Sequence, residues 1–188
     1  GVDADRRLLD VASDHVPCVA GDALRLPFAD DSVDCVVCQA LLINLPEPAA
    51  ALREFARVST DLVAAIEPNN AAVSVDSTVD SEIELESRVR EAYLRGVNTD
   101  VALGEQVESL FDDVGIAPIS TRQYDHEKRT EPPYSEDALR SAKRKASGEV
   151  LADHETELRR GVADGATYDT LRRAWREMGR EVIEQMQD

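Results

Sequence analysis

The sequence predicts an α/β fold with a doubly wound, mainly parallel sheet. Short apolar runs at 16–20, 33–39 and 62–66 have the length and composition of buried strands. The segments between them carry apolar residues at three- and four-residue spacing, as amphipathic helices do. Such alternation implies parallel strands joined by right-handed crossovers. At 188 residues the chain fits one domain with a sizeable core.

Each expected element has a local signal. Gly1-Val2-Asp3 is the end of a strand, Pro46-Glu47-Pro48 suits the first turn of a helix, and Gly115 suits a helix C-terminus. Ser135 is placed to cap the helix that begins the tail. The predicted strands are 1–3, 16–20, 33–39, 62–66 and 116–124, and the predicted helices are 5–12, 46–58, 80–94, 103–114 and two or more from 135 to 186.

Acidic residues dominate the charge of the chain. Asp and Glu number 38 against 21 Lys and Arg, so the formal net charge is −17. Acid spread over the whole length, with Arg in place of Lys, is typical of surfaces adapted to high salt, where carboxylates hold water and ions. An acidic protein without that adaptation is the alternative. In either case a phosphate backbone would be repelled, so we expect no nucleic-acid partner.

The apolar runs are far shorter than the roughly 18 residues of a membrane span, and the start has no secretory-signal pattern. We therefore expect a cytoplasmic protein with no membrane partner. The sequence does not define the oligomeric state, and a homodimer is compatible with it.

Cys35 and Cys38 form a C-x-x-C pattern, which in other contexts indicates metal or redox chemistry. Here the pair lies within an apolar run predicted as a strand, where residues three apart point to opposite faces. We interpret both as small core residues and expect no metal site.

Polar residues follow several of the predicted strands. Ligands of open α/β sheets bind beyond the carboxyl ends of the strands, which here carry Asp3, Asp22 and Gln39-Ala40. A carboxylate at Asp3 can accept hydrogen bonds from both hydroxyls of a ribose, and Asp22 can accept from the amine of a purine. The Ala23 amide can donate to a ring nitrogen. Apolar Ala4 and Leu24 can flank the base. The alternative is that Asp3 or Asp5 caps the following helix.

The run Gly21-Asp22-Ala23-Leu24-Arg25-Leu26-Pro27-Phe28-Ala29-Asp30-Asp31-Ser32-Val33-Asp34 closely resembles the segment that leads into strand four of class I S-adenosylmethionine-dependent methyltransferases. Leu52-Arg53-Glu54-Phe55-Ala56-Arg57-Val58 is similar to their helix before strand five. The resemblance covers residues 1–70 well and 103–115 more loosely.

The resemblance implies a Rossmann-like methyltransferase fold and S-adenosylmethionine as cofactor. Asp3 would take the ribose hydroxyls, Asp22 with Ala23 the adenine edge, and Gln39 with Ala40 would line the channel near the transferring methyl. Glu67-Pro68-Asn69-Asn70 would border the acceptor pocket. We expect one methyltransferase domain over 1–188, with a cofactor-binding core at 1–70, a helical insertion at 71–102, the end of the sheet at 103–134 and C-terminal helices at 135–188.

The sequence departs from this family at one point. The glycine-rich turn after strand one, which approaches the methionine part of the cofactor, is absent, and no G-x-G occurs in the chain. The chain also opens with Gly1 rather than Met. We therefore expect that the first β-α unit, on the order of 40 residues, lies upstream of Gly1.

Methyl transfer from a sulfonium is a direct displacement, so the protein mainly aligns the acceptor and excludes water. If an oxygen or nitrogen acceptor needs a base, His126 is the candidate, because it follows the predicted strand ending at Tyr124 and histidine is a common general base. A surface histidine in a charged turn explains the same position.

The helices beyond the minimal fold are expected to cover the acceptor. Tyr93, Tyr134, Tyr168 and Trp175 are available to line a pocket, although Trp175 lies on an apolar stripe that indicates core packing.

The predicted function is a methyltransferase acting on a small-molecule acceptor. A non-catalytic relative that serves as a binding or scaffold protein is the alternative, motivated by the missing glycine turn. A nicotinamide-dependent dehydrogenase also explains an acid after strand two, but it does not predict the run from Gly21 to Phe28.

Overall fold

A computed structural model of the chain describes residues 1–187; Asp188, the last residue of the predicted domain, lies outside the described residues. The chain divides into two compact units, each made of two separate stretches. The first unit comprises Gly1–Asn69 and Thr99–Arg122, and the second comprises Asn70–Asn98 and Gln123–Asp188. The assignment of all 188 residues to one methyltransferase domain stays a prediction.

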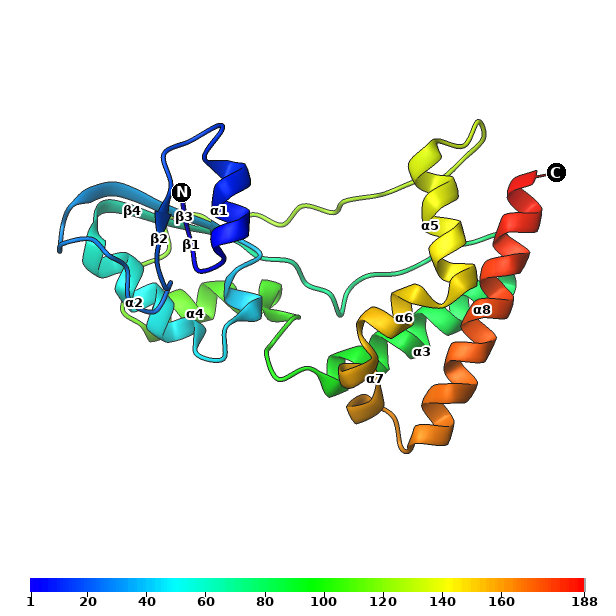
Figure 1. Ribbon diagram of the computed structural model, residues 1–188. Coiled ribbons are helices and arrows are strands. Elements are labelled where there is room, and N and C mark those ends of the chain that lie inside the picture. Colours follow the sequence, from blue (N-terminus) through cyan, green and yellow to red (C-terminus); the bar gives the residue numbers. More distant parts are fainter. Residues whose placement is uncertain (188) are drawn as a thin grey trace. The chain divides into compact units, whose positions relative to one another are not determined.

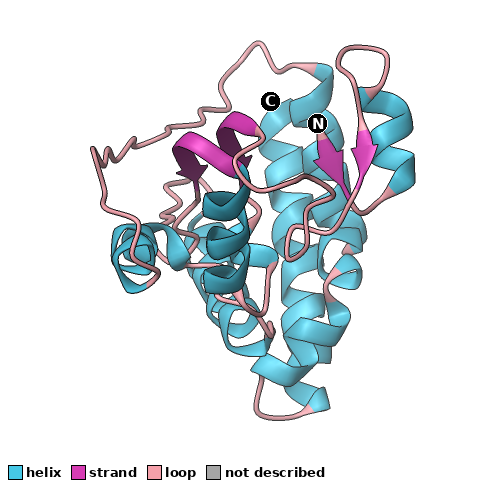
Figure 2. Ribbon diagram, turned by 90° about the vertical axis from the view of Figure 1, so that its left-hand side faces the viewer, coloured by secondary structure: helices cyan, strands magenta, loops and turns pink. Residues whose placement is uncertain are grey.

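The first unit is mixed α/β and contains two parallel strand pairs (Figure 1; strands magenta in Figure 2). Its elements are β1 (Val2–Asp3), α1 (Arg6–Ala12), β2 (Val19–Ala20), β3 (Val33–Gln39), the 3-10 helix η1 (Leu42–Asn44), α2 (Pro48–Val58), β4 (Ser59–Ile66), the 3-10 helix η2 (Leu103–Gln106) and α4 (Val107–Asp113). The predicted order of strands and helices is thus confirmed as far as β4.

The two strand pairs have defined registers. In the first, Asp3 of β1 lies opposite Ala20 of β2. In the second, Cys38 of β3 lies opposite Ala65 of β4, and the pairing shifts between Val33 and Cys35. Parallel pairing brings the carboxyl ends of both strands to the same edge of each pair, and these ends carry the residues predicted to bind the cofactor.

One face of the β3–β4 pair packs against α2 and α4 and forms the core of the first unit. Alternate residues of the strands face this core, as the period of two requires. The opposite face carries Val37, Leu62 and Ile66, which are 63%, 41% and 57% exposed. The core residues come from β3, η1, α2, η2 and α4 and are Cys38, Leu42, Ile43, Ala51, Leu52, Phe55, Leu103 and Phe111.

The predicted strand at 116–124 is wrong. These residues form neither helix nor strand, and Ile119 and Tyr124 are 84% and 79% exposed. A strand needs a neighbouring strand to satisfy its backbone N–H and C=O groups, and an apolar pattern within the segment does not provide one. The helix predicted just before it is confirmed as η2 and α4, and Gly115 follows with a φ of 81°.

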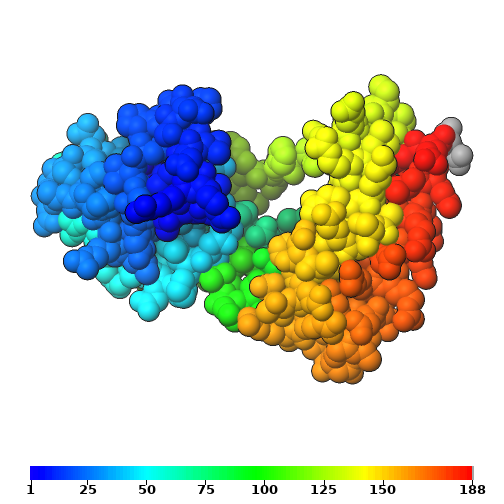
Figure 3. Space-filling view, in the orientation of Figure 1, coloured from blue at the N-terminus to red at the C-terminus, as the bar shows by residue number. Residues whose placement is uncertain are grey.

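The second unit is entirely helical in its regular structure, and its C-terminal part forms a continuous packed surface (yellow to red in Figure 3). The predicted helices at 80–94, from 135 and at 168–186 are confirmed. Ser135 caps α5 by accepting a hydrogen bond from the Ala138 amide at 3.2 Å. The helices are α3 (Asp80–Gly96), α5 (Glu136–Ser147), α6 (Glu149–Asp153), α7 (Glu155–Gly161) and α8 (Gly165–Gln187).

A separate apolar core holds these helices together, and Trp175 and Tyr168 of α8 lie fully inside it. This confirms Trp175 as a core residue. Where α3 crosses α7, the backbones meet without side chains between them, because a Cβ on Gly96 would lie 1.7 Å from the Glu157 carbonyl oxygen. A Cβ on Gly161 would lie 1.6 Å from the Ala92 carbonyl oxygen. Only glycine fits at these two positions.

Lys145 of α5 connects two acidic side chains of α3. Its ammonium donates to Glu82 and, at 2.6 Å, to Glu86, and it lies 5.5 Å from the centre of the Trp175 ring. Burial alone lowers the pKa of Lys145, but the hydrogen bonds to the two carboxylates outweigh it and the net pKa is raised. One cation therefore compensates two half-buried acids at the edge of the helical core.

Within residues 1–187, we find no helix with the length and apolar character needed to cross a membrane.

Replacing Lys145 by methionine is expected to destabilise the second unit by about 2 kcal/mol, because Glu82 and Glu86 would face each other without a cation. Chemical unfolding followed by tryptophan fluorescence measures this through Trp175. Since the folded-state pKa of Lys145 is raised, the difference should be full below the usual value of 10.5 and vanish as the pH rises through the folded-state pKa. The exposed Lys143→Met is the control, and equal stability of the two variants would contradict the assignment.

Candidate cofactor site at the strand ends

The carboxyl ends of β1 and β2 lie next to each other and carry Asp3 and Asp22. The Gly21 amide donates to the Asp3 carbonyl at 3.0 Å, which extends the pairing by one residue beyond β2. A Cβ on Gly21 would lie 2.9 Å from Pro27 Cδ and from Val2 Cγ1. Glycine at this position therefore lets the chain turn back immediately before Asp22.

Asp3 and Asp5 have different roles in the turn that follows β1. Asp5 is the N-cap of α1 and accepts a hydrogen bond from the Arg7 amide at 2.9 Å. The pKa of Asp5 is lowered, first by its side-chain hydrogen bond from Arg7 and then by this amide. Asp3 uses Oδ1 to accept from the Asp5 amide at 2.7 Å and is half-buried at the strand end. The cap is thus Asp5, and Asp3 is held by the turn beside it.

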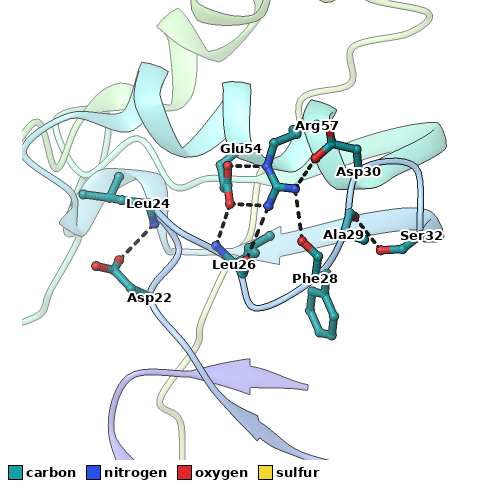
Figure 4. A network of polar contacts seen from close by, with 9 residues as sticks. All are labelled: Asp22, Leu24, Leu26, Phe28, Ala29, Asp30, Ser32, Glu54 and Arg57. Atoms are coloured by element: carbon teal, nitrogen blue, oxygen red, sulfur yellow. Dashed lines mark hydrogen bonds and ion pairs between the residues drawn. The ribbon is translucent and has the colours of Figure 1, made fainter.

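Asp22 closes the second turn (Figure 4). Its Oδ1 accepts from the Leu24 amide at 2.9 Å, and its carbonyl accepts from the Arg25 amide at 2.9 Å. The Ala23 amide is not among the donors of this turn. Ala4, Asp22 and Leu24 are exposed, so the predicted carboxylate and its apolar neighbours all reach the surface.

The loop after this turn is bound to α2 by two side chains (Figure 4). Glu54 accepts from the Leu26 amide at 2.7 Å and forms a two-point ion pair with Arg57, at 2.8 and 2.6 Å. Arg57 also donates to the Phe28 carbonyl at 3.0 Å and to Asp30 at 2.6 Å. The hydrogen bond from Arg57 lowers the pKa of Glu54, and the bonds to Glu54 and Asp30 raise the pKa of Arg57. Both groups therefore stay charged.

Gln39 is the last residue of β3 and Ala40 follows it, and both are exposed. Ala40 has a φ of 48°, a left-handed conformation that is unfavourable for a residue with a Cβ. The turn is held by Glu67 at the end of β4. Its carboxylate accepts from three successive amides, those of Leu41 and Leu42 at 3.1 and 3.0 Å and that of Ile43 at 3.3 Å. Such a row of amides is an anion-binding nest, and here it binds an acid of the same chain.

The two strand ends are joined through the core. Ala23 and Leu26 pack against the same buried cluster as Cys38 and Leu42. The structure thus brings Asp3 together with the Asp22 turn, and Gln39-Ala40 together with Glu67, and it connects the two pairs through apolar contacts rather than a direct hydrogen bond.

The two cysteines of the C-x-x-C pattern have opposite environments. Cys38 is buried, and burial, followed by the charge of Glu67 and its hydrogen bond, raises the pKa of its thiol to about 12. Cys35 is exposed, so its interpretation as a core residue is wrong. The strand period places the two on opposite faces, and only the face of Cys38 is covered by helices. Among residues 1–187, no group of three His, Cys, Asp or Glu side chains could hold a metal ion.

His126 lies in the second unit, in the exposed segment between α4 and α5 that forms neither helix nor strand. The strand that was expected to end at Tyr124 does not form. The strand-end argument for His126 as a base is therefore wrong, while its catalytic role stays a prediction.

The roles of four residues that shape this site were not predicted. Glu54 and Arg57 appeared only within a family-like run, although their spacing of three places them on one helix face. Glu67 was expected to border a pocket rather than to bind the turn after β3. Gly104 has a close backbone approach: a Cβ there would lie 2.8 Å from the Asn69 amide nitrogen, so glycine lets η2 approach the chain after β4.

Two carboxylates at adjacent strand ends, flanked by small exposed apolar side chains, are suited to a ligand with vicinal hydroxyls and an amine on a flat ring. That is the chemistry of a purine nucleoside. Residues 1–61, which include Asp3, Asp22 and Gln39-Ala40, match the family described as a methyltransferase domain. This match agrees with the resemblance to methyltransferases that the sequence predicts for the same part of the chain.

The chain is similar to demethylmenaquinone methyltransferases. It is 36% identical over 110 residues to that of Mycolicibacterium paratuberculosis, covering 56% of this chain and 48% of the relative. It is 38% identical over 109 residues to that of Mycobacterium sp. strain KMS, covering 54% and 46%. For Mycobacterium tuberculosis the identity is 54% over 48 residues, covering 26% and 20%. The chain spans about half the length, or less, of the curated relatives it matches.

Thiol alkylation under mildly alkaline conditions is expected to modify Cys38 far more slowly than Cys35, because Cys38 is buried and its thiol pKa is about 12. Mass spectrometry of peptides from the folded chain over a time course measures both rates. The same measurement in denaturant should bring the two rates together. A fast Cys38 in the folded chain would contradict the packing of β3 against α2.

Proposed function

We propose that this chain is part of a methyltransferase that uses S-adenosylmethionine to methylate a small-molecule acceptor. The observation that carries the proposal is the Asp22-Ala23-Leu24 turn beside Asp3, within a segment that matches the methyltransferase domain family. S-adenosylmethionine, when bound, supplies a methyl group already activated on a sulfonium.

The chain's own residues hold the adenosine end of this cofactor. Asp3 accepts hydrogen bonds from the ribose hydroxyls, and Asp22 accepts from the adenine amine while the Ala23 amide donates to the ring. Exposed Ala4 and Leu24 flank the base and exclude water from its faces. Gln39 and Ala40 border the channel toward the methyl. Ala40 has a left-handed conformation, and the Glu67 carboxylate holds the turn that follows it. Unfavourable backbone geometry often marks functional positions, which supports a place for Ala40 beside the channel.

We further propose that β1–β2 and β3–β4 are parts of one doubly wound parallel sheet of the Rossmann-like kind. Parallel strands are normally covered on both faces. The apolar and exposed side chains Val37, Leu62 and Ile66 support the proposal, since they form the kind of face that such a sheet covers with helices.

The acceptor is proposed to be a small molecule, and the relatives named demethylmenaquinone methyltransferases make demethylmenaquinone the first compound to test. The net charge of −17 supports the exclusion of nucleic acid as a partner and a working environment of high salt.

The competing proposal is a methyltransferase-like binding or scaffold protein without catalysis. The alternative is motivated by the pattern G-x-G, which is typical of the family's turn at the methionine end of the cofactor and does not occur within residues 1–188. The two proposals share the adenosine site and differ in methyl transfer.

Isothermal titration of the chain at high salt should detect both S-adenosylhomocysteine and adenosine, with similar affinities, because the residues present grip only the adenosine. Asp22→Asn and Asp3→Asn are each expected to weaken both ligands about tenfold, the usual effect of a lost charged hydrogen bond. For 2′-deoxyadenosine, Asp3→Asn should matter less than for adenosine.

Asp14→Asn is the matched control, since it removes the same charge from an exposed position. The absence of binding by the wild-type chain, or equal losses in Asp14→Asn and Asp22→Asn, would refute the adenosine site. Binding with no transfer to any acceptor would favour the scaffold alternative.

We also propose His126 as the base for an acceptor that loses a proton. With demethylmenaquinone as acceptor, His126→Gln should lower the transfer rate about a hundredfold and leave S-adenosylhomocysteine affinity unchanged. The exposed His15→Gln is the control. A wild-type rate in His126→Gln would show that this histidine is only a surface residue.

A further inference from the structure

We propose that Glu54 and Arg57 of α2 are positioning residues for the adenosine site, which hold the Asp22-Ala23-Leu24 turn in the conformation that meets adenine. This inference rests on the proposed function. Neither side chain is expected to touch the cofactor. They act on the turn through the loop that follows it.

The loop from Arg25 to Ser32 contains no helix or strand, so its backbone depends on side-chain partners. Three of its backbone groups are satisfied by α2 side chains. The Leu26 amide donates to Glu54, and the carbonyls of Leu26 and Phe28 accept from Arg57 at 3.4 and 3.0 Å. The far end of the loop is held by the backbone of α2, where the carbonyls of Arg57 and Val58 accept from Asp31 and Ser32.

The helix that provides these groups is firmly seated. Leu52, Phe55 and Val58, on its inner face, are at most 2% exposed. Glu54 and Arg57 lie on the neighbouring face, and their carboxylate and guanidinium meet in a two-point contact that restricts both side chains. The Glu54 side chain is 14% exposed, so water competes weakly for it. The position of Leu26 is thus defined by the core through α2.

Leu26 lies only four residues after Asp22, and the intervening turn is short and closed by the bonds from Leu24 and Arg25 to Asp22. Ala23 and Leu26 also pack on the same apolar cluster. A shift of Leu26 must therefore move the Asp22 carboxylate or the Ala23 amide. Both need accurate placement, since a hydrogen bond weakens steeply with misalignment.

The test measures the turn and the ligand separately, in the intact chain at high salt. Glu54→Ala is expected to accelerate amide exchange, read by NMR, at Leu24 as well as at Leu26, and to weaken adenosine about tenfold. Glu54→Gln keeps an oxygen for the Leu26 amide and should recover most of both effects. Arg53→Ala, an exposed position on the same helix, is the control and should change neither.

A double-mutant cycle separates positioning from general stability. If Glu54 acts through the turn, the affinity losses of Glu54→Ala and Asp22→Asn should not add. Without the Asp22 carboxylate, correct placement of the turn contributes little to adenosine binding. Additive losses, unchanged exchange at Leu24, or an adenosine affinity within about twofold of wild type in Glu54→Ala would each overturn the proposal. If the wild-type chain binds no adenosine, the proposed function fails, while exchange at Leu24 still decides whether the pair positions the turn.

Discussion

The candidate site depends most on the contacts that the guanidinium group of Arg57 makes. This group donates to Glu54, to Asp30 and to the carbonyls of Leu26 and Phe28, so one side chain organises a loop that has no regular structure. A planar fork of fixed donors can do this, whereas the point charge of a lysine cannot. Because the buried face of α2 is packed in the core, the Arg57 guanidinium has a fixed position and holds the loop beside Asp22 in place.

Carboxylates serve two purposes in this acidic chain. Those that support structure meet N–H donors: Glu54 meets Arg57 and an amide, Glu67 three amides, and Glu82 and Glu86 the ammonium of Lys145. Each is at least half-buried, so an unpaired charge would be costly. Asp22, in contrast, is exposed and holds its own turn with one oxygen. Burial and N–H partners therefore distinguish the structural carboxylates from the surplus of acid on the surface.

The two units have separate apolar cores, and this explains why each unit is made of two separate stretches of the chain. The core of the first unit is made of strands and helices packed on one sheet face, and that of the second of helices alone. Each unit is built from two stretches of sequence. The segment that carries η2 and α4 returns to the first unit, where Leu103 and Phe111 complete its core. Sequence order therefore does not coincide with the packing, since the chain leaves the first unit after Asn69 and re-enters it at Thr99.

Local patterns in the sequence determined most of the secondary structure and predicted the family that residues 1–61 match. Strand β3, the proline at the start of α2, the Ser135 cap and the stripe through Trp175 depend on neighbours a few residues away, and they were predicted. The run from Gly21 to Asp34 likewise predicted the family that residues 1–61 match, because its residues are adjacent in sequence.

Tertiary structure alone decided what depends on distant partners. Residues 116–124 have an apolar pattern but no paired neighbour, so no strand forms there. Strand period predicts that Cys35 and Cys38 face opposite ways, but only packing against α2 shows which is buried. Glu67 lies 24 to 26 residues from the amides it binds, and Glu54 lies 28 from Leu26. Such contacts leave no periodic signal in one sequence, because they join segments that the fold brings together.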